Sequence, residues 1–89
     1  QLIGSEHFAV WEIYIPDAKQ YNINNIPKDK DIIDNLNYTI RRLEEIRVGY
    51  GKSIIINSGY RGDELNKLVG GVKDSMHTKG LAVDLKWSP

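Results

Sequence analysis

DKDIIDNLNYTIRRLEEIRVGYG (residues 29–51) is the stretch that decides the fold, because its apolar residues recur at three- and four-residue steps. This period places them on one stripe of an α-helix. Acidic residues at the start and arginines toward the end suit the helix dipole, and Gly49 and Gly51 predict its C-terminal end. The stripe consists of Ile32, Ile33, Leu36, Ile40, Leu43, Ile46 and Arg47.

Three shorter elements are expected after this helix. KSIIIN (52–57) is a continuous, β-branched apolar run, which is typical of a strand covered on both faces. DELNKLVGG (63–71) predicts a short helix that begins near Asp63 and ends before the glycine pair. LAVDLKW (81–87) alternates in polarity, so it predicts a second strand with Asp84 on the face away from the core.

The segment before the long helix carries a weaker pattern. In SEHFAVWEIYI (5–15), Phe8, Trp11 and Ile15 follow helical spacing and Ser5 precedes them as a candidate N-cap. A short helix is therefore expected, with both aromatic side chains in the core or in an interface. The polar residues that follow, up to the long helix, read as a connecting loop.

Together these elements predict a single α+β domain over residues 1–89, with helices packed on a small antiparallel sheet. A sheet of two strands is marginal by itself. We therefore expect an incomplete sheet, in a domain truncated at its C-terminus, whose open edge could pair with a second copy of the chain.

Composition excludes several classes of function. Twelve basic and twelve acidic side chains cancel, so no charge pattern favours nucleic acid as a partner. No apolar run approaches the roughly 20 residues of a membrane span, and no signal peptide is visible. The chain has no cysteine, so a metal would have to be bound by His, Asp and Glu side chains.

SMHTKGLAVD (75–84) suggests such a metal site. His77 and Asp84 stand seven residues apart, with a glycine turn between them. An imidazole and a carboxylate are both suitable zinc donors. Two simpler readings stay open: His77 as a surface histidine, and Asp84 in a structural ion pair with Arg61.

A larger set of motifs contains these residues. INSGYRGDELNKLVGGVKDSMHTKGLAVDL (56–85) resembles the zinc D-alanyl-D-alanine peptidases, especially the compact group found in phage lysins and bacterial cell-wall enzymes. The shared pattern is S-G-Y-R, L-N, V-G-G and S-x-H-x-x-G-x-A-x-D. The segments SEHFAVWE, NINNIP and NLNYTIRRLEEIRVGYG also look like that group's lead-in. A related metal fold occurs in the Hedgehog signalling domain.

The resemblance implies a role for each matching residue. His77 and Asp84 match the first two ligands of a zinc ion (Zn2+), and Arg61 matches the arginine that stabilises the oxyanion. Ser75 and Tyr60 are candidate substrate contacts. The family's third ligand, a histidine, and its acidic general base have no counterpart after Asp84, so both are expected to lie outside this chain.

For three of these residues a structural reading stays open beside the functional one. Arg61 could organise its loop by bonding to carbonyl groups, Ser75 could fix the loop of the histidine, and Tyr60 could be a packing residue. For Ser75 and Tyr60 the structural role is the preferred interpretation.

The implied function is zinc-dependent hydrolysis, by zinc-bound water, of a peptide bond next to a D-amino acid in peptidoglycan stem or cross-bridge peptides. The enzyme would be a carboxypeptidase or an endopeptidase that acts on the cell wall. This chain alone, with two ligands, is expected to be weakly active or inactive. The alternative is a non-catalytic module that binds muropeptides or braces a phage or cell-wall assembly.

Overall fold

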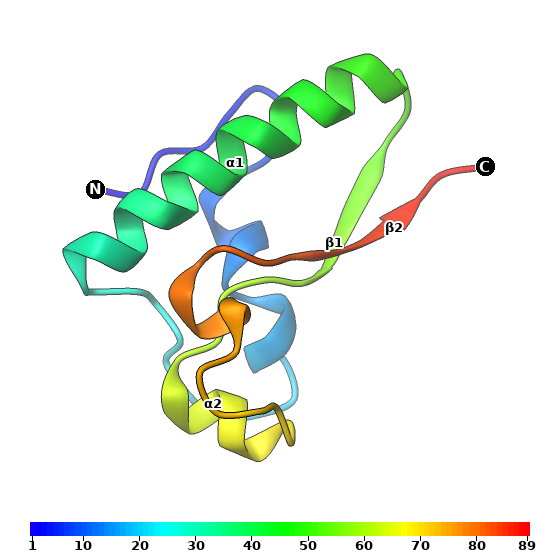
Figure 1. The fold of residues 1–89 in the computed structure, drawn as a ribbon. Coiled ribbons are helices and arrows are strands. Elements are labelled where there is room, and N and C mark those ends of the chain that lie inside the picture. Colours follow the sequence, from blue (N-terminus) through cyan, green and yellow to red (C-terminus); the bar gives the residue numbers. More distant parts are fainter.

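The chain folds into a small α+β domain, as the sequence predicts, and the computed structural model describes all residues 1–89. Figure 1 shows the long helix α1 running alongside a sheet of two antiparallel strands. In chain order the elements are η1 (Val10–Ile13), η2 (Pro16–Ala18), α1 (Lys30–Tyr50), β1 (Ile54–Ser58), α2 (Asp63–Leu68), η3 (Met76–Lys79) and β2 (Asp84–Trp87), where η denotes a 3-10 helix. No helix has the length and apolar character needed to cross a membrane.

Helix α1 begins and ends where its sequence predicts. The Asp29 carboxylate accepts hydrogen bonds from the backbone N–H groups of Asp31 (2.8 Å) and Ile32 (3.4 Å), which satisfies two donors of the first turn. Gly51 ends the helix in the left-handed conformation (φ 77°), and its N–H donates to the carbonyl of Arg47. Glycine adopts this conformation at little cost, so the helix stops there.

The apolar stripe of α1 forms the centre of the core. Leu36, Ile40 and Leu43 are buried, and the core residues they join are Phe8, Ile13, Ile54, Ile56 and Tyr60. Ile46, in contrast, is 44% exposed, so the prediction that it belongs to the buried stripe is wrong. At 100° per residue it lies about 80° around the helix from Leu36, at the flank of the stripe.

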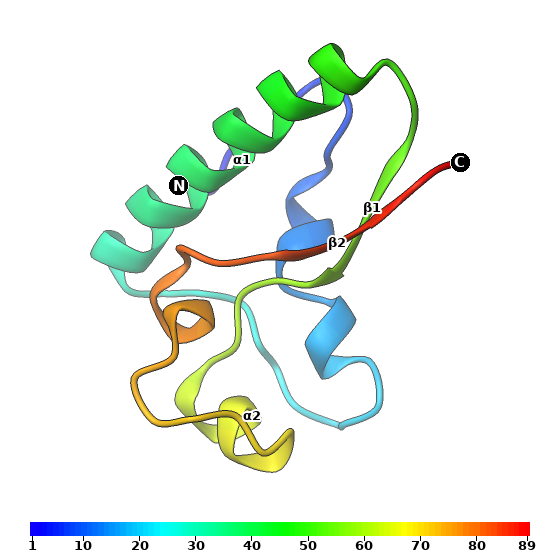
Figure 2. The same ribbon diagram turned by 45° about the vertical axis from the view of Figure 1, so that its right-hand side comes forward.

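The sheet is covered on one face only, which corrects the prediction of two covered faces. Ile54 and Ile56 point into the core, while Ile55 between them is exposed. Figure 2 shows the reason: α1 and the N-terminal segment lie on the same side of the two strands. One layer of cover leaves the alternate side chains of each strand in water.

The second strand is shorter than predicted. It begins at Asp84, which pairs with Ser58, the last residue of β1, and the register shifts between Ile56 and Ser58. Residues 81–83 lie beyond the end of β1, so they have no strand partner, and Leu81 is exposed. Pairing, and not the alternating pattern alone, sets where the strand starts.

The N-terminal segment also differs from expectation. Ser5 does not cap a helix; only the single turn η1 forms, and it follows Ala9, whose N–H donates to Glu12 (2.7 Å). Phe8 is buried in the core as predicted, but the Trp11 side chain is exposed. It borders a surface cavity of about 410 Å³.

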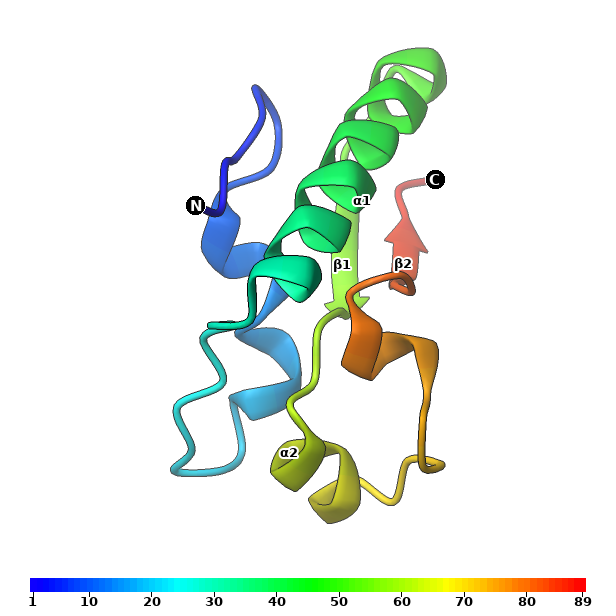
Figure 3. The ribbon, with the colours of Figure 1, turned by 60° about the vertical axis from the view of Figure 1, so that its left-hand side comes forward.

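Figure 3 shows where the chain's loops converge. Helices α2 and η3 both lie at the end of the sheet where β1 stops and β2 starts. The turn after β1 and the loop before β2 are therefore brought together, and they carry the residues singled out in the sequence.

The extent of the core can be tested with two matched truncations on α1. Leu36→Ala should lower the free energy of unfolding by about 2–5 kcal/mol, because it leaves a cavity in the packed core. Ile46→Ala should cost less than about 1 kcal/mol, because that side chain is already partly hydrated. Urea denaturation followed by circular dichroism measures both changes. Equal losses of unfolding free energy would contradict the conclusion that Ile46 lies outside the buried stripe.

Candidate metal centre

His77 lies in a turn of 3-10 helix that is fixed at both ends. At the start, the Ser75 hydroxyl oxygen accepts the His77 N–H (3.2 Å), which caps η3. At the end, Gly80 takes the left-handed conformation (φ 76°). The prediction that Ser75 fixes the loop is thus confirmed by this hydrogen bond, while its contact with a substrate stays a prediction.

Helix α1 holds the same turn from the other side. The Asn35 amide donates to the carbonyl of Lys79 (2.8 Å), and the Thr39 hydroxyl donates to the carbonyl of Gly80 (2.7 Å). A Cβ at position 80 would stand 2.9 Å from Cγ of Leu36, so glycine is also required for the turn to approach the helix. The His77 backbone therefore has a defined position relative to the core.

The His77 ring is oriented by a backbone carbonyl. Its Nδ1 lies 2.8 Å from the oxygen of Gly59, which can only accept, so Nδ1 carries the proton of the neutral ring. Nε2 then has a free lone pair, and it lies 3.6 Å from Oδ2 of Asp84. The imidazole is mostly buried (12% exposed), whereas the carboxylate is 70% exposed.

This arrangement suits a bound cation. An imidazole lone pair and a carboxylate oxygen repel each other unless a proton or a cation lies between them, and 3.6 Å is too long for a good hydrogen bond. Two ligands of a tetrahedral zinc ion at its usual bond lengths stand about 3.3 Å apart. The donor types and their separation therefore fit zinc, and the carbonyl on Nδ1 is the usual partner of a metal-binding histidine.

The structure brings no third ligand to this pair. The one group of three His, Asp or Glu side chains close enough to share an ion consists of Glu6, His7 and Glu44. The expectation that a third ligand and a general base come from outside these residues stays a prediction.

Arg61 is close to the pair through its backbone, and its side chain is unpaired. Its N–H donates to the His77 carbonyl (3.1 Å), which joins the turn after β1 to η3. Its guanidinium makes no ion pair with Asp84, so that structural alternative for Asp84 is not formed. The Nε–H of Arg61 is buried and has no hydrogen-bond partner within the chain.

Tyr60 is a core residue in this structure. It belongs to the buried cluster, and its N–H donates to the carbonyl of Ile13 (2.7 Å). Burial raises the pKa of its phenol, and the negative charges of Asp63 and Asp29 add to this. The packing interpretation describes its contacts; a substrate contact stays a prediction.

Asn25 is a site-organising residue that the sequence did not single out. This buried side chain donates to the carbonyls of Tyr14 and Tyr60 and accepts the N–H of Gly62, each at 2.8 Å. It therefore fixes the turn that carries Arg61. Its position in an Asn-rich loop gave no signal, because neighbouring asparagines of the same loop are exposed.

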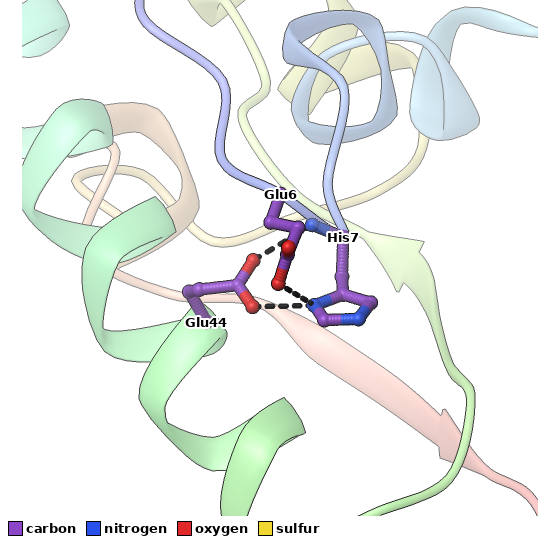
Figure 4. A group of neighbouring side chains, drawn as sticks. All are labelled: Glu6, His7 and Glu44. Carbon is purple, nitrogen blue, oxygen red and sulfur yellow. Dashed lines mark hydrogen bonds and ion pairs between the residues drawn. The ribbon is translucent and has the colours of Figure 1, made fainter.

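The remaining histidine belongs to a separate cluster between the N-terminal segment and α1. Figure 4 shows the His7 ring and the Glu44 carboxylate pointing toward each other, with Glu6 beside them. Glu44 accepts hydrogen bonds from the Ser5 hydroxyl (2.6 Å), the His7 N–H (2.8 Å) and His7 Nδ1 (2.5 Å). Both Glu44 oxygens therefore accept hydrogen bonds. These bonds clamp the N-terminal segment to α1.

The fold and the paired donors describe a small α+β protein with a two-ligand candidate metal centre. Residues 11–89 match the profile of the Peptidase M15 family, and the chain belongs to this family. Membership confirms the resemblance to the zinc D-alanyl-D-alanine peptidases and makes the chain a metallopeptidase-type domain, for which zinc is the typical metal. A search of curated proteins and a search of solved structures each returned no match.

The Glu44 clamp predicts acid sensitivity of the fold. Hydrogen bonds from Ser5 and His7 lower the pKa of Glu44 from 4.5 to about 2. A carboxyl whose pKa is lower in the folded state stabilises the fold above its unfolded pKa, and that contribution is lost as the pH falls. The free energy of unfolding should therefore drop between pH 4.5 and about 2.

Glu44→Gln tests this, because it removes the titrating group. The variant should be less stable than wild type at neutral pH, and the difference should shrink as the pH falls through this range. Urea titrations at several pH values measure it. Glu45→Gln is the matched control, since Glu45 forms only an exposed pair with Arg42; the same pH dependence in both variants would contradict the clamp.

Proposed function

We propose that this chain supplies the zinc-binding core of a peptidase that hydrolyses peptide bonds next to D-alanine in peptidoglycan stem or cross-bridge peptides. The observation that carries the proposal is the Nε2 lone pair of His77 facing the Asp84 carboxylate at 3.6 Å. Membership of the Peptidase M15 family supports a metallopeptidase. The peptide class and the bond follow from the sequence resemblance.

Each residue of the centre has a separate task in this proposal. Zinc, when bound, supplies a Lewis acid and lowers the pKa of water. His77 and Asp84 bind the ion, one as a neutral donor and one as an anion, which leaves part of the ion's charge uncompensated. The Gly59 carbonyl keeps the His77 proton on Nδ1, so that Nε2 stays available as a donor.

Arg61 is the proposed binding group for negative charge. Its guanidinium presents planar donors that match a carboxylate or an oxyanion better than an ammonium group does. The buried Nε–H without a partner supports this role, because a substrate oxygen would satisfy it. Asn25 and the His77 carbonyl both hold the turn after β1 by hydrogen bonds, so the Arg61 backbone has a fixed position for such a contact.

Several features of the proposal come from the resemblance alone. These are the third ligand and the general base, action on the cell wall, a phage or bacterial lysin context, and contacts of Ser75 and Tyr60 with the substrate. Pairing of the open sheet edge with a second copy follows instead from the two-stranded sheet. Each of these stays a prediction.

Calorimetric titration with zinc tests the metal site directly. We expect weak one-to-one binding by the 89-residue chain, because two protein ligands hold zinc poorly. His77→Ala and Asp84→Asn should abolish it, and His7→Ala should leave it unchanged. Binding that is lost in His7→Ala and kept in His77→Ala would place the metal at the other histidine and contradict the proposal.

Because this chain alone is expected to be weakly active or inactive, turnover is tested with the zinc-loaded chain extended by the segment expected to carry the third ligand and the general base, and with a stem peptide that ends in D-alanyl-D-alanine. Arg61→Ala should lower kcat by about 10²–10³-fold with zinc affinity unchanged, because an oxyanion donor is lost. Arg61→Lys is the matched control, which keeps the charge and loses the planar fork. Zinc and peptide binding by wild type without any release of D-alanine would instead favour the non-catalytic binding module.

A further inference from the structure

We infer that Asp17, a residue of η2 remote in sequence from both candidate ligands, is a positioning residue for His77 and Asp84. The inference rests on the proposed function in one respect, namely that these two side chains bind the metal. It assigns a task to a carboxylate in a segment that the sequence marks only as a loop.

The contacts of Asp17 are all at the end of β1. The Ser58 hydroxyl donates to its Oδ1 (2.8 Å) or Oδ2 (3.0 Å), and the Gly59 N–H donates to Oδ2 (3.0 Å). Asp17 has no ion pair with a lysine or arginine, although its own segment carries Lys19. Its charge is thus directed at two consecutive residues where the strand leaves the sheet.

The first of these residues is aligned with Asp84. Ser58 is the register partner of Asp84, and the pair follows a shift in register after Ile56. A register shift loosens the ladder of hydrogen bonds that would otherwise fix the strand ends. The hydrogen bond from the Ser58 hydroxyl to the Asp17 carboxylate supplies a substitute anchor on the β1 side, opposite the strand that carries Asp84.

The second residue orients His77. The peptide before Gly59 is held by Asp17 through its N–H, and the peptide after it is held by the Tyr60 N–H bond to Ile13 (2.7 Å). With both flanking peptides fixed, the Gly59 carbonyl has one direction, and it accepts the Nδ1 proton of His77. Asp17 therefore acts on the imidazole through one backbone residue.

A purely structural role makes a different prediction. If Asp17 only braced the turn, its loss would lower stability and leave the His77 proton where it is. A free neutral imidazole prefers its proton on Nε2, the atom that a metal at this site needs. Loss of the orienting carbonyl should hence move the proton to Nε2, and the tautomer of His77 reports this without any metal or substrate.

The experiment compares Asp17→Ala with the conservative Asp17→Asn, which keeps one acceptor oxygen for the Gly59 N–H. Imidazole 15N shifts of the metal-free chain, recorded for the neutral ring, give the tautomer. We expect the Nδ1–H form in wild type and Asp17→Asn, and a shift toward Nε2–H in Asp17→Ala. Zinc affinity should fall about tenfold in Asp17→Ala and recover in Asp17→Asn, as for other partners of metal-binding histidines.

Ser5→Ala is the control for a lost hydrogen bond in the same N-terminal segment, and it should change neither readout. Should Asp17→Ala not fold, Ser58→Ala removes the hydroxyl that anchors the carboxylate and should lower zinc affinity by up to about tenfold. An unchanged tautomer and affinity in Asp17→Ala or Ser58→Ala, or a wild-type ring protonated at Nε2, overturns the inference. Absence of zinc binding in wild type, with the tautomer shift still present, overturns the proposed function and leaves the positioning of His77 intact.

Discussion

A side chain at position 59 would place its Cβ 2.2 Å from the carbonyl oxygen of Ile13, so the chain can pass itself at this point only with glycine there. This close approach lets the Tyr60 N–H reach Ile13 and leaves the Gly59 carbonyl facing η3. The position of the His77 ring depends on that one carbonyl. Without that carbonyl, nothing would fix which nitrogen of the His77 ring offers its lone pair to a metal.

The centre is held from two sides that are themselves connected. Helix α1 fixes η3 through Asn35 and Thr39, and the N-terminal segment fixes the turn after β1. Glu44 joins that segment back to α1 through Ser5 and His7. These contacts connect the N-terminal segment, the turn after β1, η3 and α1 around the core. Such connections suit a site that uses only short loops and a two-stranded sheet.

Some of these features could be predicted because their physical cause is local. The start of α1 near Asp29 and its end at Gly51 each depend on residues within one helical turn, and the sequence predicted both positions; the capping bonds of the Asp29 carboxylate came only from the structure. Errors arose where cause and effect are distant. Ser5 has the chemistry of a helix cap, yet its hydroxyl bonds to Glu44, 39 positions away. Ile55 sits in an apolar run, but no second layer covers it.

By itself, then, the sequence determined the long helix, the order of the elements and the chemical pair of His77 and Asp84, because propensity, periodicity and ligand chemistry are carried by the residues themselves. Only the tertiary structure decided which nitrogen of His77 carries the proton, which strand face is open, and that Asp17 reaches the end of β1. These depend on backbone groups brought together across 18 to 42 positions, and a carbonyl looks the same at every position of a sequence.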